Sequence, residues 1–143
     1  MLILDTEFIF GLSSSDSRHE DVVKMLKRIK AGDIKNVAVS DIAILETYIV
    51  LRNRGKTDEA KLIFQKLNEI WKEYEIKEIK TLNKNLILRQ MLIEKEHGTS
   101  FFDSLMAASA EMYDHSIISN DEIYDRLKLT RISFCFSGGE NDG

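Results

Sequence analysis

Four acidic residues of this 143-residue chain stand where the surrounding pattern favours apolar or structural residues. Asp5 ends the apolar run LIL, Glu46 falls within the apolar stripe of a predicted helix, Asp103 opens another helix, and Asp121 follows the apolar run SII. Carboxylates gathered at one point would raise one another's pKa values and destabilise the fold unless a cation neutralised them. Mg²⁺ or Mn²⁺ would do so, because these ions prefer oxygen ligands, and could activate a water for attack on a phosphodiester.

Glu46 is the most informative of the four acids. At about 100° per residue, Ile42, Ile49 and Val50 share its face of the predicted helix. A carboxylate facing a core is costly unless it is paired or bound to a metal. The alternative is a Glu at the edge of the stripe, reaching solvent or pairing with an arginine.

The other three acids also have ordinary structural explanations. Asp5 could cap a short helix after it, and Asp103 lies in the capping-box-like sequence SFFD. Asp121 suits a turn or a helix cap in SNDE. These explanations stay open, but a strand end, an inward helix face, a helix start and a second strand end can all converge at one point of the same fold.

Short apolar segments alternate with amphipathic ones along the whole chain, which predicts a parallel sheet between helix layers with right-handed crossovers. In such folds the carboxyl ends of the strands meet at one edge, where ligands bind. Glycine and small polar residues separate the segments, since the chain has no proline. The expected strands are 2–4, 37–39, 76–82, 116–119 and 131–134, and the expected helices are 17–30, 40–54, one beginning at 57, 85–97 and 100–114.

The bulk properties favour one ordinary globular domain, which we place at residues 1–136, with 137–143 as a disordered tail. The net charge of −4 means that nucleic-acid binding needs local cations, such as those within 24–30 and 52–56. The single cysteine, Cys135, excludes an internal disulfide and is expected to be a small buried residue. We expect a cytoplasmic protein, since we find neither a signal peptide nor a membrane span.

Four segments, LDT, VSDIAILE, FFDSLMAASA and ISND, resemble the motifs of the PIN-domain ribonucleases, and of VapC-type toxins and their archaeal relatives in particular. The resemblance spans nearly the whole chain, in the family's order and spacing. It implies a three-layer α/β/α sandwich with strand order 3-2-1-4-5 and a Mg²⁺- or Mn²⁺-dependent endoribonuclease acting on RNA. The metal-binding acids would be Asp5, Glu46, Asp103 and Asp121.

The resemblance also implies supporting residues and partners. The hydroxyl residues Thr6 and Ser119 match family positions, and Asp125 would be an additional outer acid. Family members commonly form homodimers, and toxin members are inhibited by an antitoxin protein. Two departures weaken the toxin assignment more than the nuclease assignment: Glu7 replaces a common Asn, and Phe102 replaces a basic residue.

Two other classes of protein share parts of this pattern. A receiver-like signalling domain also has a parallel sheet, strand-end acids and Mg²⁺, but it needs an Asp after strand three and a Lys after strand five. Here those strands end in KTL and FCF. A PIN-like domain without activity, serving as an interaction module, is the other alternative, and Glu7 leaves it open.

Overall fold

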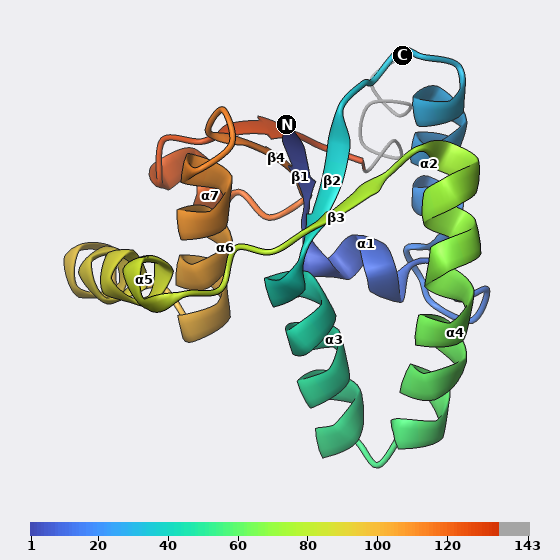
Figure 1. The fold of residues 1–143 in the computed structure, drawn as a ribbon, viewed down its shortest axis with the longest axis horizontal. Helices are drawn as coiled ribbons and strands as arrows, with labels where there is room; N and C mark the ends of the chain where they lie inside the picture. Colours follow the sequence, from blue (N-terminus) through green and yellow to red (C-terminus); the bar gives the residue numbers. More distant parts are fainter. Residues whose placement is uncertain (135–143) are drawn as a thin grey trace.

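The computed structural model describes residues 1–134 and contains a five-stranded, fully parallel sheet in the order β3-β2-β1-β4-β5 (Figure 1). This is the predicted topology. The elements along the chain are β1 (Leu2–Leu4), α1 (Thr6–Phe10), α2 (His19–Lys30), β2 (Val37–Ser40), α3 (Asp41–Asn53), α4 (Thr57–Tyr74), β3 (Lys77–Ile79), α5 (Lys84–His97), α6 (Phe101–Glu111), β4 (Ser116–Ile118), α7 (Ile123–Arg126) and β5 (Thr130–Ile132).

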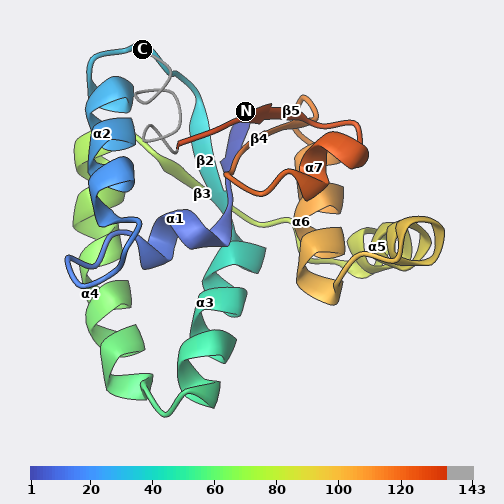
Figure 2. The ribbon, with the colours of Figure 1, turned by 180° about the vertical axis from the view of Figure 1, so that it is seen from behind.

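The sheet is covered on both sides, as its unalternating apolar strands require. In Figures 1 and 2, α2 and α4 lie on one side of the central strands, and α5 and α6 lie on the other. β1 is the middle strand, with Ile3 opposite Ala38 on β2 and Ile117 on β4, and all three side chains are inaccessible to solvent. The middle of the sheet is therefore a rigid base for whatever follows β1 and β4.

Strands β3, β4 and β5 are shorter than the sequence predicts. After β3 and β5, side chains take the backbone N–H groups that a longer strand would use. The N–H groups of Thr81 and Leu82, after β3, donate to the two carboxylate oxygens of Asp41 at 2.9 and 3.1 Å. After β5, the N–H of Phe134 donates to the side chain of Asn120 at 2.9 Å. The helix predicted from residue 17 begins at His19, and the one predicted to reach 114 ends at Glu111.

The Asp41 contacts also fix two helices relative to each other. Asp41 is the first residue of α3 and accepts a third hydrogen bond, from the hydroxyl of Thr81 at 2.9 Å. That hydroxyl is in turn 2.9 Å from the hydroxyl of Ser109, which lies on α6. The segment after β3 thus joins the start of α3 to α6, and these are the helices that carry Glu46 and Asp103.

Three predictions concern residues outside the described part of the chain: the end of the domain at 135–136, the buried position expected for Cys135, and the disordered tail at 137–143. Within residues 1–134, none of the helices combines the length and the apolar character that crossing a membrane would require.

Candidate metal centre

Asp5 forms the buried floor of the site. It follows β1 and caps α1, accepting a hydrogen bond from the N–H of Thr6 at 2.8 Å, so the structural explanation holds. Its other carboxylate oxygen accepts a hydrogen bond from Ser119, beyond the end of β4, at 2.6 Å. The residue is only 8% exposed, and this burial is the main reason that its pKa rises to about 7, despite the hydrogen bond from Ser119.

Glu46 turns toward Asp5 from the second turn of α3. Its carboxylate accepts a hydrogen bond of 2.5 Å from the hydroxyl of Thr6, the residue next to Asp5. The side chain is half-buried, and this burial raises its pKa, with further increases from the charges of Asp103 and Glu7. Glu46 is therefore partnered by a hydroxyl among other acids, rather than by the arginine of the structural alternative.

Asp103 and Asp121 each combine a local structural role with a place near the other acids. The N–H of Asp103 donates to the hydroxyl of Ser100 at 3.2 Å, the predicted cap of α6. Burial raises the pKa of Asp103, and the charge of Asp121 raises it further. Asp121 is exposed and accepts from the N–H of Ile123 at 3.0 Å, so it also terminates the loop before α7.

The four acids lie close enough together to influence one another's ionisation. The charge of Glu46 raises the pKa of Asp5, the charge of Asp103 raises that of Glu46, and the charge of Asp121 raises that of Asp103. The four come from the residue after β1, from α3, from α6 and from the loop after β4. Asp5 is buried, Glu46 and Asp103 are half-buried, and Asp121 is exposed. The structure brings the four acids to the carboxyl edge of the sheet, and their role as metal ligands stays a prediction.

The two hydroxyl residues of the predicted site and Glu7 also lie in this region. Thr6 and Ser119 are buried and donate to the acids, as described above. The carboxylate of Glu7 accepts a hydrogen bond from the N–H of Asn120 at 2.8 Å and lies 3.5 Å from the hydroxyl of Ser119. Glu7 therefore adds a carboxylate to the acid cluster.

Asp125 does not join the other acids. Its two carboxylate oxygens accept hydrogen bonds from Arg131, both at 3.0 Å, and this contact lowers the pKa of Asp125. The sequence gives no sign of this pairing, because Arg131 lies on β5 and becomes a neighbour only through the strand order. The expected outer acid is instead part of an ion pair that fastens α7 to β5.

Tyr124 is a member of the site that the sequence did not indicate. Its side chain is 1% exposed, and its hydroxyl lies 3.5 Å from a carboxylate oxygen of Asp5 and 3.5 Å from one of Asp103. Burial and the surrounding carboxylates raise its pKa, so the phenol keeps its proton and acts as a donor. A single aromatic residue in a helix of four residues offers no periodic pattern from which its orientation could be read.

The basic clusters singled out in the sequence lie elsewhere. Lys30 donates to the backbone of Glu73 and stacks over Tyr74, near the amino ends of the strands. Arg52 and Arg54 stand at the tip of the α3–α4 hairpin, away from the sheet (Figure 1). Arg18 and Arg131 lie nearer the acids. Arg18 forms two hydrogen bonds with Asp16 at 2.9 Å, and Arg131, paired with Asp125, also interacts with the charge of Asp121. The pKa of Arg18 is raised chiefly by Asp16 and also by the charges of Glu7 and Asp5.

The donor set fits a hard divalent cation in its chemistry. The groups that face one another are carboxylates and hydroxyls, so every donor is an oxygen, as Mg²⁺ and Mn²⁺ prefer. In residues 1–134 no three Asp, Glu, His or Cys side chains are close enough together to form a ready-made metal-binding group. The hydroxyl of Tyr124 lies between Asp5 and Asp103, and that of Ser119 contacts Asp5 and lies 3.5 Å from Glu7.

The fold and the site together define an α/β protein with an acidic, oxygen-rich site at the carboxyl edge of a parallel sheet in order 3-2-1-4-5. The chain belongs to the PIN-domain family, whose sequence model, described as a PIN domain, matches residues 2–129. The expected family is thereby confirmed, and the receiver-like alternative loses its support.

Solved structures of toxins have the same fold. VapC20 of Mycobacterium tuberculosis, described as a sarcin-ricin loop cleaving toxin, has a TM-score of 0.69 at 17% identity, covering 92% of this chain and 98% of that one. VapBC2 of Rickettsia felis, bound to a promoter DNA fragment, has a TM-score of 0.66 at 14% identity, covering 92% and 97%. A toxin-antitoxin complex from Klebsiella pneumoniae has a TM-score of 0.62 at 12% identity, covering 94% of this chain and 98% of that one. No curated protein sequence matches this chain.

Proposed function

We propose that this protein is a metal-dependent endoribonuclease of the PIN-domain family. One observation carries the proposal: hydrogen bonds at the carboxyl edge of the sheet link the four acids. Ser119 joins Asp5 to the backbone of Asp121, Tyr124 lies between Asp5 and Asp103, and Thr6, next to Asp5, donates to Glu46. Burying and gathering carboxylates is costly for stability, and a fold retains such a cost where the acids are used.

Asp5, Glu46, Asp103 and Asp121 would hold the metal, which we propose is Mg²⁺ or Mn²⁺. When bound, such an ion lowers the pKa of a water and stabilises negative charge on phosphate oxygens. The chain's own groups prepare the site for it. Thr6 and Ser119 fix the rotamers of Glu46 and Asp5, and the exposed Asp121 leaves the outer side of the site open to a polymer.

RNA is the proposed substrate. The support is family membership and the fold shared with VapC20, whose description names cleavage of the sarcin-ricin loop. The guanidinium of Arg18, held by Asp16, interacts with the charges of Glu7 and Asp5, and that of Arg131 interacts with the charge of Asp121, so both cations could contact a phosphate beside the metal-binding acids. An RNA chain, which carries many negative charges, could thus approach the acidic site where cations lie at its margin.

The experiment is cleavage of a structured RNA by the purified protein in Mn²⁺ or Mg²⁺, with EDTA as the control. We expect internal cleavage that EDTA abolishes and products with 5′-phosphate and 3′-hydroxyl ends. Cleavage that persists in EDTA would contradict metal dependence. A complete lack of cleavage with several RNAs and both metals would favour the remaining alternative, an inactive PIN-like interaction module.

We further propose an antitoxin as protein partner. The support is the shared fold with a toxin-antitoxin complex from Klebsiella pneumoniae and with VapBC2. The protein encoded beside this one would copurify with it and suppress its RNA cleavage. Such a substrate and partner would place the protein in the cytoplasm.

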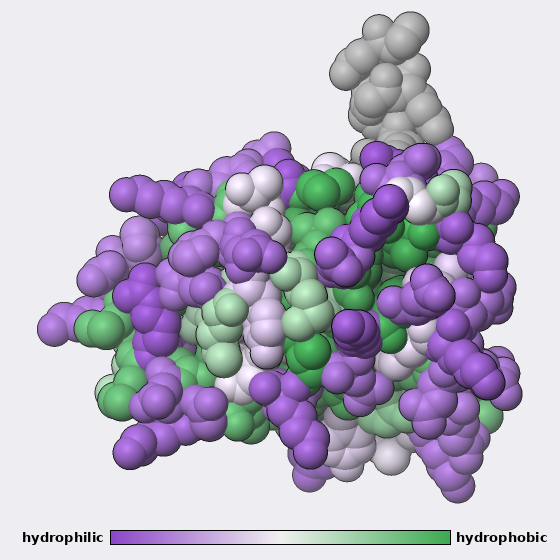
Figure 3. Space-filling view, turned by 45° about the horizontal axis from the view of Figure 1, so that its top comes forward, coloured by the Kyte–Doolittle hydropathy of each residue, from purple (hydrophilic) through white to green (hydrophobic). Residues whose placement is uncertain are grey.

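Homodimer formation is the last part of the proposal, and α5 offers a surface for it. One side of α5 packs on α6 through Leu86 and Ile93, while Leu88 and Met91 on its outer side are 52% and 58% exposed. Apolar groups alternate with polar ones over this end of the molecule, at the left of Figure 3. A helix that is apolar on both sides is suited to packing on two partners.

Met91→Glu is expected to weaken dimerisation about tenfold or more, because it places a carboxylate at the centre of an apolar contact. Sedimentation velocity over a concentration series measures the change. Leu62→Glu on α4 is the matched control, since Leu62 is also 58% exposed but lies on another helix, and it should leave the dimer unchanged. Equal effects of the two substitutions on dimerisation would contradict the proposal that α5 forms the interface.

A further inference from the structure

Tyr124 is fixed in place by contacts that surround α7. Its ring is buried, and its backbone carbonyl accepts a hydrogen bond from the N–H of Leu129 at 3.1 Å. The next residue, Asp125, forms the two-bond ion pair with Arg131, and Arg131 also donates to the carbonyl of Ser119 at 3.2 Å. These contacts tie α7 to β5 and to the segment after β4, and the buried ring of Tyr124 extends from this fixed backbone.

This hydroxyl lies between two acids that are far apart in the sequence. It is 3.5 Å from Oδ1 of Asp5 and 3.5 Å from Oδ1 of Asp103. Both distances exceed the 2.7–2.8 Å that is usual for an O–H···O hydrogen bond. The phenol therefore spans the gap between the two carboxylates, and it can donate its one proton to either of them.

We infer that Tyr124 is a positioning residue, whose hydroxyl sets the separation and orientation of Asp5 and Asp103 and thereby the affinity of the acid cluster for a divalent cation. The inference rests on the proposed function. Groups that hydrogen-bond to metal ligands fix the ligands' orientation, and their loss typically weakens metal binding 10- to 100-fold. The backbone around β1 holds Asp5, and the cap of α6 holds Asp103, but within residues 1–134 the contact between the two carboxylates runs through Tyr124.

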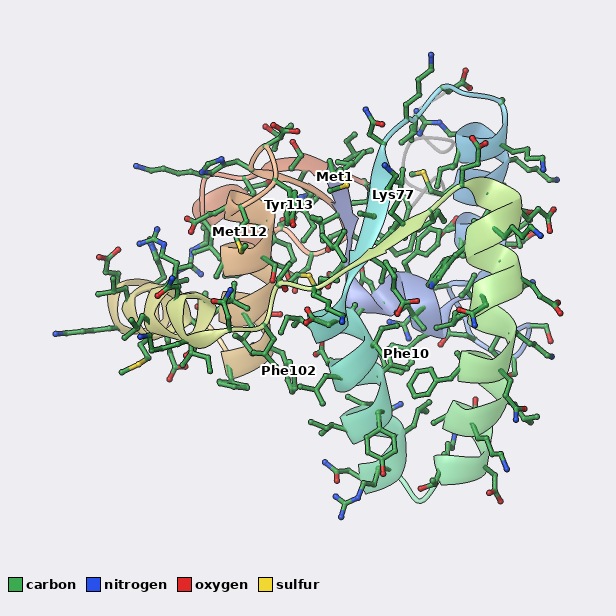
Figure 4. All side chains as sticks on the ribbon, in the orientation of Figure 1. Met1, Phe10, Lys77, Phe102, Met112 and Tyr113 are labelled. Atoms are coloured by element: carbon green, nitrogen blue, oxygen red, sulfur yellow. The ribbon has the colours of Figure 1, made fainter. Side chains whose placement is uncertain are left out.

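The test is Tyr124→Phe, which removes the hydroxyl and keeps the ring. We expect the Kd for Mn²⁺, measured by electron paramagnetic resonance without RNA, to rise about tenfold. The kcat for RNA at saturating Mn²⁺ should change less than about threefold, because the variant keeps every carboxylate. Tyr113→Phe is the matched control: Tyr113 lies beyond the other end of α6 (Figure 4), and its loss should leave the Kd unchanged.

Three outcomes would overturn the inference. The first is a Kd for Tyr124→Phe within twofold of wild type. The second is a loss of stability in EDTA large enough to explain the weaker binding, which thermal unfolding of both variants would reveal. The third is a wild-type protein that binds no Mn²⁺, which would also overturn the proposed function. If the wild-type protein binds Mn²⁺ and Tyr124→Phe shows the expected rise in Kd, but no RNA is cleaved, the role of Tyr124 is supported and only the ribonuclease activity is refuted.

Discussion

Asp5→Asn is expected to reduce metal-dependent RNA cleavage roughly 1,000-fold or more, because it removes the most buried charge from the acid cluster. The substitution is nearly isosteric. Its side-chain oxygen can still accept from the N–H of Thr6, and the hydroxyl of Ser119 can rotate to accept from the new amide. The loss is therefore a loss of charge rather than of fold, and initial rates at saturating Mn²⁺ measure it.

Asp125→Asn is the matched control for this substitution. Asp125 is an aspartate in the same part of the fold, but its side chain is 53% exposed and paired with Arg131, outside the acid cluster. This variant should keep its cleavage activity within a few-fold of wild type. Cleavage by Asp5→Asn at the wild-type rate, or an equal loss in both variants, would refute the catalytic role of the acid cluster.

The metal-free protein is expected to lose stability as the pH rises from about 4 to about 7. The pKa of Asp5 is about 7 in the folded protein, against an ordinary value of 3.8. Between these values the folded protein keeps a proton that the unfolded chain has released, so the free energy of unfolding falls as pH increases, by up to about 4 kcal/mol from this group. Burial raises the pKa values of Glu46 and Asp103 as well, and their effects have the same sign.

Urea unfolding between pH 4.5 and pH 8, in EDTA and in Mg²⁺, measures this dependence. The carboxyls with lowered pKa values, Asp16, Asp114 and Asp125, weaken the fold only toward the acidic end, below this window. We expect Mg²⁺ to restore stability at high pH and Asp5→Asn to flatten the metal-free curve. A metal-free stability that is constant or rising across the window would contradict the burial of a charged Asp5.

The parallel sheet and the convergence of the acids could be predicted from the sequence because both follow from general rules, whereas the strand order was implied by the resemblance to the PIN-domain family. Parallel strands deliver Asp5 and the Ser119–Asp121 segment to one edge, and the helical period points Glu46 inward. The ordinary roles of Asp5 and Asp103 as caps were also visible, and the structure shows that a cap and a site residue can be the same side chain.

What the sequence could not give depends on contacts between distant segments. The shortening of β3 follows from Asp41, which lies 40 and 41 residues before the backbone groups that it binds. Asp125 lies outside the site because it pairs with Arg131 on β5. Tyr124 reaches the site because α7, a single helical turn, is placed beside the acids. Such pairings are fixed only when the whole fold is assembled.

Anomalous diffraction from a crystal soaked in Mn²⁺ tests the central claim most directly, namely that four acids from separate elements form one divalent-cation site. We expect a peak at the carboxyl edge of the sheet, about 2–2.5 Å from carboxylate oxygens of at least two of the residues Asp5, Glu46, Asp103 and Asp121. A soaked crystal with no peak there, or with Mn²⁺ bound only at other acids, would contradict it.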